Sequence, residues 1–209
     1  MTRKQSRHKP NPATGKRRAK TPAIETGELR IIGGDWRSRR LTFPAVGGVR
    51  PTPSRVRETL FNWLMAALPG ARCLDLFAGS GVLGLEALSR GARETQFVDH
   101  TRALCDALKA NLGLLKSDGG KVICQDVTTF LSHPAETPYD ILLMDPPFRQ
   151  DWLTRLLPLI AGNGWVTQGS WVYIEHESEL ASVAVPENWS LHRERIAGQV
   201  CYRLYRVGQ

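Results

Sequence analysis

The sequence is poor in cysteine, and the few cysteines that it has are not grouped. There is no Cys-x-x-Cys pair and no local cluster of histidines, so neither a zinc site nor a disulfide framework is expected. Scattered thiols of this kind are typical of proteins from a reducing cytosol. The four cysteines are Cys73, Cys105, Cys124 and Cys201.

Long apolar runs are also missing. No uninterrupted apolar stretch approaches the roughly 20 residues of a membrane-spanning helix, and the basic N-terminus lacks the apolar core of a signal peptide. We therefore expect a soluble, cytoplasmic protein without a membrane partner. With 209 residues and no internal repeat, the chain can form one α/β domain with an appendage, large enough to fold without metal or disulfide bonds.

Acidic residues are scarce in the first part of the chain. Residues 1–57 contain 15 Lys+Arg but only 3 Asp+Glu, whereas residues 58–209 contain 13 Lys+Arg and 17 Asp+Glu. A basic arm before a mildly acidic domain indicates a polyanionic partner. Residues 1–28 have almost no apolar side chains and are expected to form a disordered basic tail. The alternative is a tail that only promotes solubility.

Residues 29–69 are expected to form a hairpin and a helix. Two short β-type runs flank Gly33-Gly34, which predicts a hairpin or bulged turn from which arginines project. The Pro-Thr-Pro sequence that follows leads into a helix with one apolar stripe. Thr52 is expected to cap this helix, and Pro53 to be its first residue.

Residues 70–209 alternate between strand and helix patterns in the order of a parallel α/β sheet. The last two β runs are separated only by Ala197-Gly198, which predicts an antiparallel hairpin at one edge of that sheet. The expected strands lie near residues 71–77, 94–99, 121–125, 139–145, 170–176, 189–196 and 199–207. The expected helices lie near residues 81–90, 101–115, 127–132 and 149–161.

A glycine-rich turn follows the first of these strands. Gly79, Gly81 and Gly84 fit the pattern Gly-x-Gly-x-x-Gly, and Asp99 follows at the end of the next strand. Glycines let a nucleoside approach the backbone closely, and an acid at that spacing can bind ribose hydroxyls. A simple tight turn between strand and helix is the alternative, but the acid at the second strand end argues against it.

The charge around the turn distinguishes between two nucleoside ligands. A pyrophosphate needs a helix N-terminus without nearby anions, but Asp75 lies at the mouth of this turn, with no Lys or Arg from residue 73 to residue 89. This favours S-adenosylmethionine, which carries an ammonium and a sulfonium group. Asp126, at the third strand end, is either a partner for adenine or a helix N-cap. The expected cofactor-binding residues are Asp75, Phe77, Ala78, Gly79, Ser80, Gly81, Asp99 and Asp126.

The tetrad Asp145-Pro146-Pro147-Phe148 follows a strand of buried composition. Asp145 and the Pro146 carbonyl group could accept hydrogen bonds from both N–H groups of an aromatic amine and stabilise the charge that develops on methyl transfer. The prolines fix the carbonyl direction, and Phe148 could stack on the base. A strand-ending turn is the alternative. The tetrad does not identify the acceptor, because adenine N6, cytosine N4, guanine N2 and a glutamine amide present similar amines.

Several further stretches resemble the bacterial 16S ribosomal RNA guanine-N2 methyltransferase family. The resemblance covers about residues 28–207, and its family-specific part is the arginine-rich N-terminal signature. One departure is Asp99, where relatives often carry Glu. Besides the glycine turn and the tetrad, the matching stretches are residues 30–34, 50–52, 55–64, 85–90, 188–195, 198–199 and 202–205.

The resemblance implies a Rossmann-like class I methyltransferase sheet, S-adenosylmethionine as cofactor, and one guanine of 16S ribosomal RNA as acceptor. The implied substrate is an assembled or nearly assembled small subunit. Competing hypotheses are a DNA adenine methyltransferase, although the chain has little room for a target-recognition region, and a catalytically silent RNA-binding assembly factor. A monomer without a metal site is expected. The arginines expected to contact RNA are Arg37, Arg39, Arg40, Arg50 and Arg55.

Overall fold

The computed structural model describes residues 1, 25–46, 48–180 and 182–209. The disorder expected for the basic tail therefore falls mostly on residues outside the described part. Within that part, the chain forms a two-stranded hairpin, a seven-stranded sheet and five helices. None of the described helices is long and apolar enough to cross a membrane.

The N-terminal hairpin pairs strand β1 (Thr26–Arg30) with strand β2 (Arg40–Pro44) in antiparallel register. Because β1 starts at Thr26, the tail boundary expected at residue 28 is wrong: residues 26–28 belong to the hairpin. The turn between the strands contains Gly33-Gly34 and lies against the end of helix α2 (Val82–Ser89). The hairpin is thus docked on the main domain through its turn.

The glycine at position 34 is required by this close approach. A Cβ atom on Gly34 would lie only 1.7 Å from the carbonyl oxygen of Ser89, and φ at Gly34 is +74°. The next residue, Asp35, donates its backbone N–H to the same oxygen at 2.7 Å. The glycine pair therefore serves the contact between hairpin and helix as well as the turn.

Helix α1 (Ser54–Trp63) starts one residue later than expected. The capping role expected of Thr52 is wrong, because Pro53 occupies the cap position and no side chain caps the first turn. Thr52 is instead buried, and its hydroxyl group faces Asp145. The apolar stripe of α1, which includes Leu60, packs against one face of the large sheet.

The large sheet has the strand order β5-β4-β3-β6-β7-β9-β8. Strands β3 to β7 run parallel, and β9 runs antiparallel between β7 and β8. This confirms the mostly parallel sheet with an antiparallel C-terminal hairpin. The bounds are β3 (Arg72–Leu76), β4 (Glu94–Asp99), β5 (Gly120–Cys124), β6 (Tyr139–Met144), β7 (Val166–Glu177), β8 (Trp189–Ala197) and β9 (Val200–Val207).

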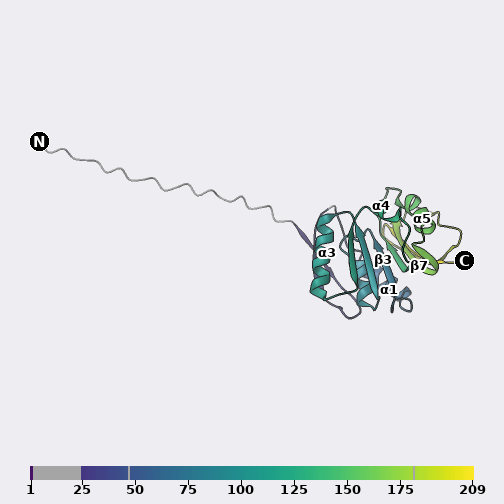
Figure 1. Ribbon diagram of the computed structural model, residues 1–209, viewed down its shortest axis with the longest axis horizontal. Helices are drawn as coiled ribbons and strands as arrows, with labels where there is room; N and C mark the ends of the chain where they lie inside the picture. Colours follow the sequence, from purple (N-terminus) through teal and green to yellow (C-terminus); the bar gives the residue numbers. More distant parts are fainter. Residues whose placement is uncertain (2–24, 47, 181) are drawn as a thin grey trace.

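Helices cover both faces of this sheet. Helices α1, α2 and α3 (Arg102–Leu115) bury their apolar sides on one face, and α4 (Val127–Leu131) and α5 (Trp152–Gly162) bury theirs on the other. Figure 1 shows α4 and α5 side by side, away from α3. Helix α5 starts later than expected near residue 149, because φ is positive at Arg149 and Asp151, and such residues cannot continue a helix.

The strand order reverses between β3 and β6. The chain continues from β3 outward to β4 and β5 on one side, and returns to place β6 on the other side of β3. In α/β sheets, ligands bind outside the carboxyl ends of the strands at such a reversal. The glycine turn follows β3 and the Asp-Pro-Pro-Phe tetrad follows β6, so both lie at this position.

Candidate active site

The glycine turn between β3 and α2 has a left-handed backbone at three positions. The angle φ is 58° at Phe77, 54° at Gly79 and 78° at Gly81. A Cβ atom on Gly81 would lie 2.4 Å from Cδ1 of Leu108, and the left-handed backbone at this position strains any residue other than glycine. On the other side, Val49 Cγ1 lies 3.3 Å from the place of a Cβ atom on Gly79. The segment before α1 therefore packs over the turn.

The other residues of the turn are held by the surrounding sheet and helices. The ring of Phe77 packs edge-on against Trp152, with 5.0 Å between the ring centroids. The backbone N–H of Ala78 donates to the carbonyl oxygen of Val98 at 3.0 Å, and Ser80 is buried. The turn is therefore a fixed part of the fold, with its backbone conformation set before any ligand binds.

Asp99 connects this turn to the end of β4. Its Oδ2 atom accepts the backbone N–H of Gly79 at 2.8 Å, and its Oδ1 atom accepts that of Thr101 at 2.8 Å. Each carboxylate oxygen can accept a second hydrogen bond, and the side chain keeps 11% of its surface exposed. Asp99 can therefore hold the turn and still accept hydrogen bonds from a ligand.

Asp75 lies beneath the turn, not at its open mouth. The residue is 2% exposed, and its Oδ2 atom accepts the backbone N–H of Gly84 at 2.9 Å. Burial raises the pKa of Asp75 well above its usual value, and the nearby carboxylates of Asp145 and Asp99 raise it further. The position expected from the sequence is thus corrected, because the carboxyl group supports the turn from below.

Asp126 is an exposed residue that caps helix α4. Its Oδ1 atom accepts the backbone N–H of Thr129 at 2.9 Å and also contacts the Thr129 hydroxyl group. Of the two roles that the sequence left open, helix capping is therefore present in the structure. A contact with adenine stays a prediction.

The Asp-Pro-Pro-Phe tetrad starts directly after β6. Asp145 is half-buried, and its Oδ2 atom lies 3.5 Å from Oγ1 of Thr52. Burial raises the pKa of Asp145 to about 6, against the opposite effect of the Thr52 hydroxyl group. Pro146 is buried, Pro147 is exposed and Phe148 is half-buried. A carboxyl group with this pKa is ionised at neutral pH and can accept a hydrogen bond from an amine.

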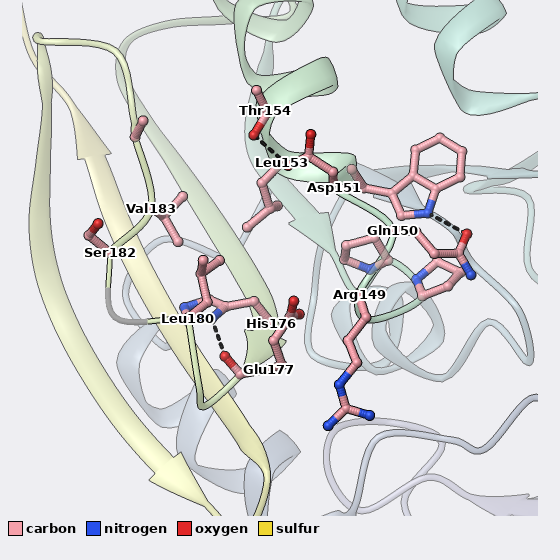
Figure 2. Close-up of a pocket in the computed structure, with 14 residues that line it drawn as sticks. Arg149, Gln150, Asp151, Leu153, Thr154, His176, Glu177, Leu180, Ser182 and Val183 are labelled. Atoms are coloured by element: carbon pink, nitrogen blue, oxygen red, sulfur yellow. Dashed lines mark hydrogen bonds between the residues drawn. The ribbon is translucent and has the colours of Figure 1, made fainter.

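A cavity of about 400 Å³ lies beside the tetrad. Figure 2 shows the loop after β6 on one side of it, and the end of β7 with the segment that follows on the other. Nδ1 of His176 lies 2.8 Å from the carbonyl oxygen of Glu177 and must donate to it. Nε2 is then an acceptor, and it has no partner among the described residues. The cavity thus has a mixed polar and apolar lining, with an unused acceptor nearby.

One acid near the tetrad was missed by the sequence analysis. Glu175 lies in β7 next to Asp145 and is 2% exposed, and the hydroxyl group of Tyr173 donates to its Oε1 atom at 2.9 Å. The available signal was an acidic residue directly after the apolar run from Trp171 to Ile174. The described residues contain no group of three or more His, Cys, Asp or Glu side chains placed to bind a metal ion.

The five arginines expected to contact RNA lie in two separate places. Arg50 and Arg55 are exposed and flank Thr52 in the sequence, close to Asp145. The hairpin turn instead contacts the end of α2, and Arg39 donates to the last turn of α3 at 3.2 Å. Both helices end near the amino ends of the parallel strands, whereas Asp145 follows the carboxyl end of β6. The structure therefore does not bring the exposed hairpin residues Arg37, Arg39 and Arg40 together with Arg50 and Arg55.

A further arginine of α1 has a structural role. Arg57 is 3% exposed, and its Nη1 atom donates to Oε1 of Glu86 at 2.5 Å and to the carbonyl oxygen of Arg30 at 3.0 Å. Glu86 also accepts the backbone N–H of Ile32 at 2.6 Å. This buried ion pair ties α1, α2 and the hairpin together.

Comparison with known proteins identifies relatives over nearly the whole described fold. The ribosomal RNA small subunit methyltransferase D of Escherichia coli (strain K12) is 48% identical over 181 residues, which is 87% of this chain and 91% of that protein. The protein of the same name from Haemophilus influenzae is 43% identical over 183 residues, with 86% and 94% covered. The solved structure of the Escherichia coli protein yhhF has a TM-score of 0.82 and 48% identity, with 87% and 99% covered.

A family model also matches this chain. The model described as conserved hypothetical protein 95 matches residues 29–206, which include the hairpin, the glycine turn and the tetrad. These are the features that carried the resemblance seen in the sequence. The chain therefore belongs to the conserved hypothetical protein 95 family, the family of these bacterial small-subunit ribosomal RNA methyltransferases.

Proposed function

We propose that the protein transfers a methyl group from S-adenosylmethionine to the exocyclic N2 amine of one guanine, of the guanine 966 type, in 16S ribosomal RNA of the small subunit. The observation that carries this proposal is the position of Asp145. It is the first residue after β6, next to β3 and its glycine turn, and its pKa of about 6 leaves it ionised at neutral pH. The names of the relatives support ribosomal RNA as the substrate class.

The residues around the glycine turn fit S-adenosylmethionine. The turn allows a nucleoside to approach the backbone, and Asp99 has lone pairs left for ribose hydroxyl groups. The Asp145 carboxylate is close enough to raise the pKa values of Asp75 and Glu175. A ligand with a sulfonium and an ammonium group suits the ionised carboxylate of Asp145, whereas a pyrophosphate is repelled by it. S-adenosylmethionine would supply a methyl group on a positively charged sulfur atom.

Asp145 and Pro146 prepare the acceptor amine. The lone pair of an exocyclic amine is delocalised into the ring, which makes the nitrogen a weak nucleophile. Hydrogen bonds from its two N–H groups to the Asp145 carboxylate and the Pro146 carbonyl group favour a pyramidal nitrogen and stabilise its developing charge. Bound S-adenosylmethionine would supply the methyl group to this nitrogen and keep the electron pair of the broken carbon–sulfur bond on sulfur. The surplus proton of the nitrogen passes to Asp145.

The cavity beside the tetrad offers a place for the target base. A base inside an RNA fold must be unstacked from its neighbours before an enzyme can reach its amine. The cavity volume of about 400 Å³ falls within the range of ligand pockets. Phe148 is half-buried and belongs to the same tetrad as Pro146 and Pro147, which line the cavity, and it supplies an aromatic face on which the base can stack.

Contacts with the RNA backbone come from the basic N-terminal region. Arg50 and Arg55 are placed to bind phosphates next to the target guanine, and the hairpin group, Arg37, Arg39 and Arg40, binds phosphates further away. Phosphate contacts position an RNA but carry little base information, so the choice of base is left to the pocket around Asp145 and Phe148. One chain holds all these groups, and we infer a monomeric enzyme.

A methyl-transfer assay with three acceptors tests the proposal. Radiolabelled S-adenosylmethionine is offered with small ribosomal subunits, free 16S ribosomal RNA or duplex DNA, and the modified nucleotide is then mapped. We expect label on one guanine N2 in the subunit. Label on adenine in DNA would identify a DNA enzyme, and subunit binding without any label would identify a silent assembly factor.

A further inference from the structure

Glu175 is a buried acid next to the proposed catalytic carboxylate. Strands β6 and β7 are neighbours in register, so Asp145 and Glu175 occupy adjacent positions at their carboxyl ends. Leu143 and Tyr173, two residues earlier on each strand, pack on the face of the sheet that α1 covers. Side chains alternate along a strand, and this places Asp145 and Glu175 on that same face.

Two hydroxyl groups contact this pair of acids. Tyr173 donates to Oε1 of Glu175 at 2.9 Å, and the Thr52 hydroxyl group lies 3.5 Å from Oδ2 of Asp145 and close enough to Glu175 to lower the pKa of that residue. Among the described residues, no Lys or Arg forms an ion pair with Glu175 or Asp145. The Thr52 hydroxyl group is therefore placed between two carboxyl groups that have no ion-pair partner in the described part of the chain.

A buried and a half-buried carboxyl group in this arrangement do not both ionise, because like charges in a desolvated site repel strongly. Glu175 is the more deeply buried of the two, and burial together with the Asp145 carboxylate raises the pKa of Glu175 well above its usual value. A neutral Glu175 can donate its own O–H group to Oγ1 of Thr52. The hydroxyl proton of Thr52 is then directed to Asp145.

We propose that Glu175 is a positioning residue, which as a neutral acid fixes the Thr52 hydroxyl group toward Asp145 and holds that carboxylate ready to accept the target amine. The role rests on the proposed function, since it acts through Asp145. Tyr173 donates to Oε1 of Glu175 and so forms the start of a series of hydrogen bonds. The hydrogen bonds then run in one direction, from Tyr173 to Glu175, to Thr52 and finally to Asp145.

Matched substitutions at Glu175 and Thr52 test this series of hydrogen bonds. Glu175→Gln keeps a neutral side chain with a hydrogen-bond donor group and an acceptor oxygen, whereas Glu175→Leu removes both at similar volume. We expect Glu175→Gln to keep kcat within about threefold of wild type, and Glu175→Leu to lower kcat by about 10- to 100-fold with unchanged affinity for S-adenosylmethionine. Thr52→Ser should resemble the Gln variant, and Thr52→Val the Leu variant. Equal losses in Glu175→Gln and Glu175→Leu would overturn the proposal.

The pH profile of kcat/KM shows whether each variant raises or lowers the pKa of Asp145. Removing a donor to Asp145 raises the pKa of that carboxyl group, so the acid limb should move to higher pH in both Glu175→Leu and Thr52→Val. An ionised Glu175 would have the opposite signature, because its removal takes away a negative charge and moves the limb of Glu175→Leu to lower pH. The groups that face Glu175 are Asp75 from β3, Asp145 after β6, Tyr173 from β7, Tyr202 from β9 and the Thr52 hydroxyl group.

Infrared spectroscopy supplies a readout that does not depend on methyl transfer. At neutral pH, the difference between wild type and Glu175→Gln should contain the band of a protonated carboxylic acid, and its absence would overturn the inference. An enzyme that methylates DNA instead of small subunits would contradict the proposed function alone. The same variants measured on that DNA substrate would still support or overturn the hydrogen-bond chain.

Discussion

At Asp145, burial and the proposed chemistry act in opposite directions. The residue must be ionised to accept a hydrogen bond from the amine, but burial favours its protonated form and raises its pKa to about 6. We therefore predict that kcat/KM rises about tenfold per pH unit below pH 6 and levels off above it, since kcat/KM reports groups of the free enzyme. Rates measured from pH 5 to 8 check this. A profile without an acid limb in that range would contradict the assignment.

Substitution of the same residue should separate transfer from donor binding. Asp145→Ala is expected to lower kcat by about 100- to 1,000-fold, because the amine loses the acceptor that stabilises its charge. The affinity for S-adenosylmethionine should stay close to wild type. Phe148→Ala should lose about tenfold through reduced stacking. Single-turnover rates and calorimetry measure the two effects. Transfer by Asp145→Ala at a near wild-type rate would show the mechanism to be wrong.

Asp99 should show the reverse pattern. We predict that Asp99→Ala weakens S-adenosylmethionine binding by about 10- to 100-fold, since the ribose hydroxyl groups lose a charged acceptor and the turn loses its bond from Gly79. Asp106→Ala serves as the control, because it removes an exposed acid of α3 that pairs with Arg102. Calorimetry should show little change in the control. Unchanged affinity in Asp99→Ala would contradict the ribose assignment.

Among the secondary-structure elements, the hairpin depends most on a single close contact. Gly34→Ala would force a methyl group onto the carbonyl oxygen of Ser89 and strain a backbone with φ of +74°. We predict a loss of about 2–4 kcal/mol in the free energy of unfolding, from overpacking together with the left-handed backbone. Gly48→Ala is the control, since its φ is +71° but no atom lies within 4 Å of the added carbon. Denaturant unfolding should show a clearly smaller loss in the control.

At the scale of the whole molecule, the arginines proposed to bind RNA lie in two separate places, the hairpin and the start of α1. We predict that replacing Arg37, Arg39 and Arg40 together with Gln weakens subunit binding and lowers the salt slope by up to about 2, because phosphate contacts release counterions. Replacing Arg50 and Arg55 should lower kcat/KM as well, since they lie beside the target. Binding and transfer are measured across a salt series. If the triple variant keeps its affinity and slope, the electrostatic docking surface lies elsewhere.

Local patterns were sufficient for most of the large sheet. The alternation of strand and helix, the glycine turn and the final antiparallel pair were all predicted, because each depends on residues close together in the chain. The errors occurred where a distant contact decided the outcome. Thr52 has the composition of a helix cap, yet it is drawn to Asp145, which is 93 residues away.

The sequence by itself determined the fold class, the glycine turn and the Asp-Pro-Pro-Phe tetrad, since these rest on backbone conformation and on hydrophobic periodicity. Only the tertiary structure decided which charges meet. The strand order brings β3, β6 and β7 together, so Asp75, Asp145 and Glu175 become neighbours although 100 residues separate the first from the last. It also assigns Arg57 to a buried ion pair and leaves Arg50 at the surface, because burial depends on the packing of the whole chain and not on residue type.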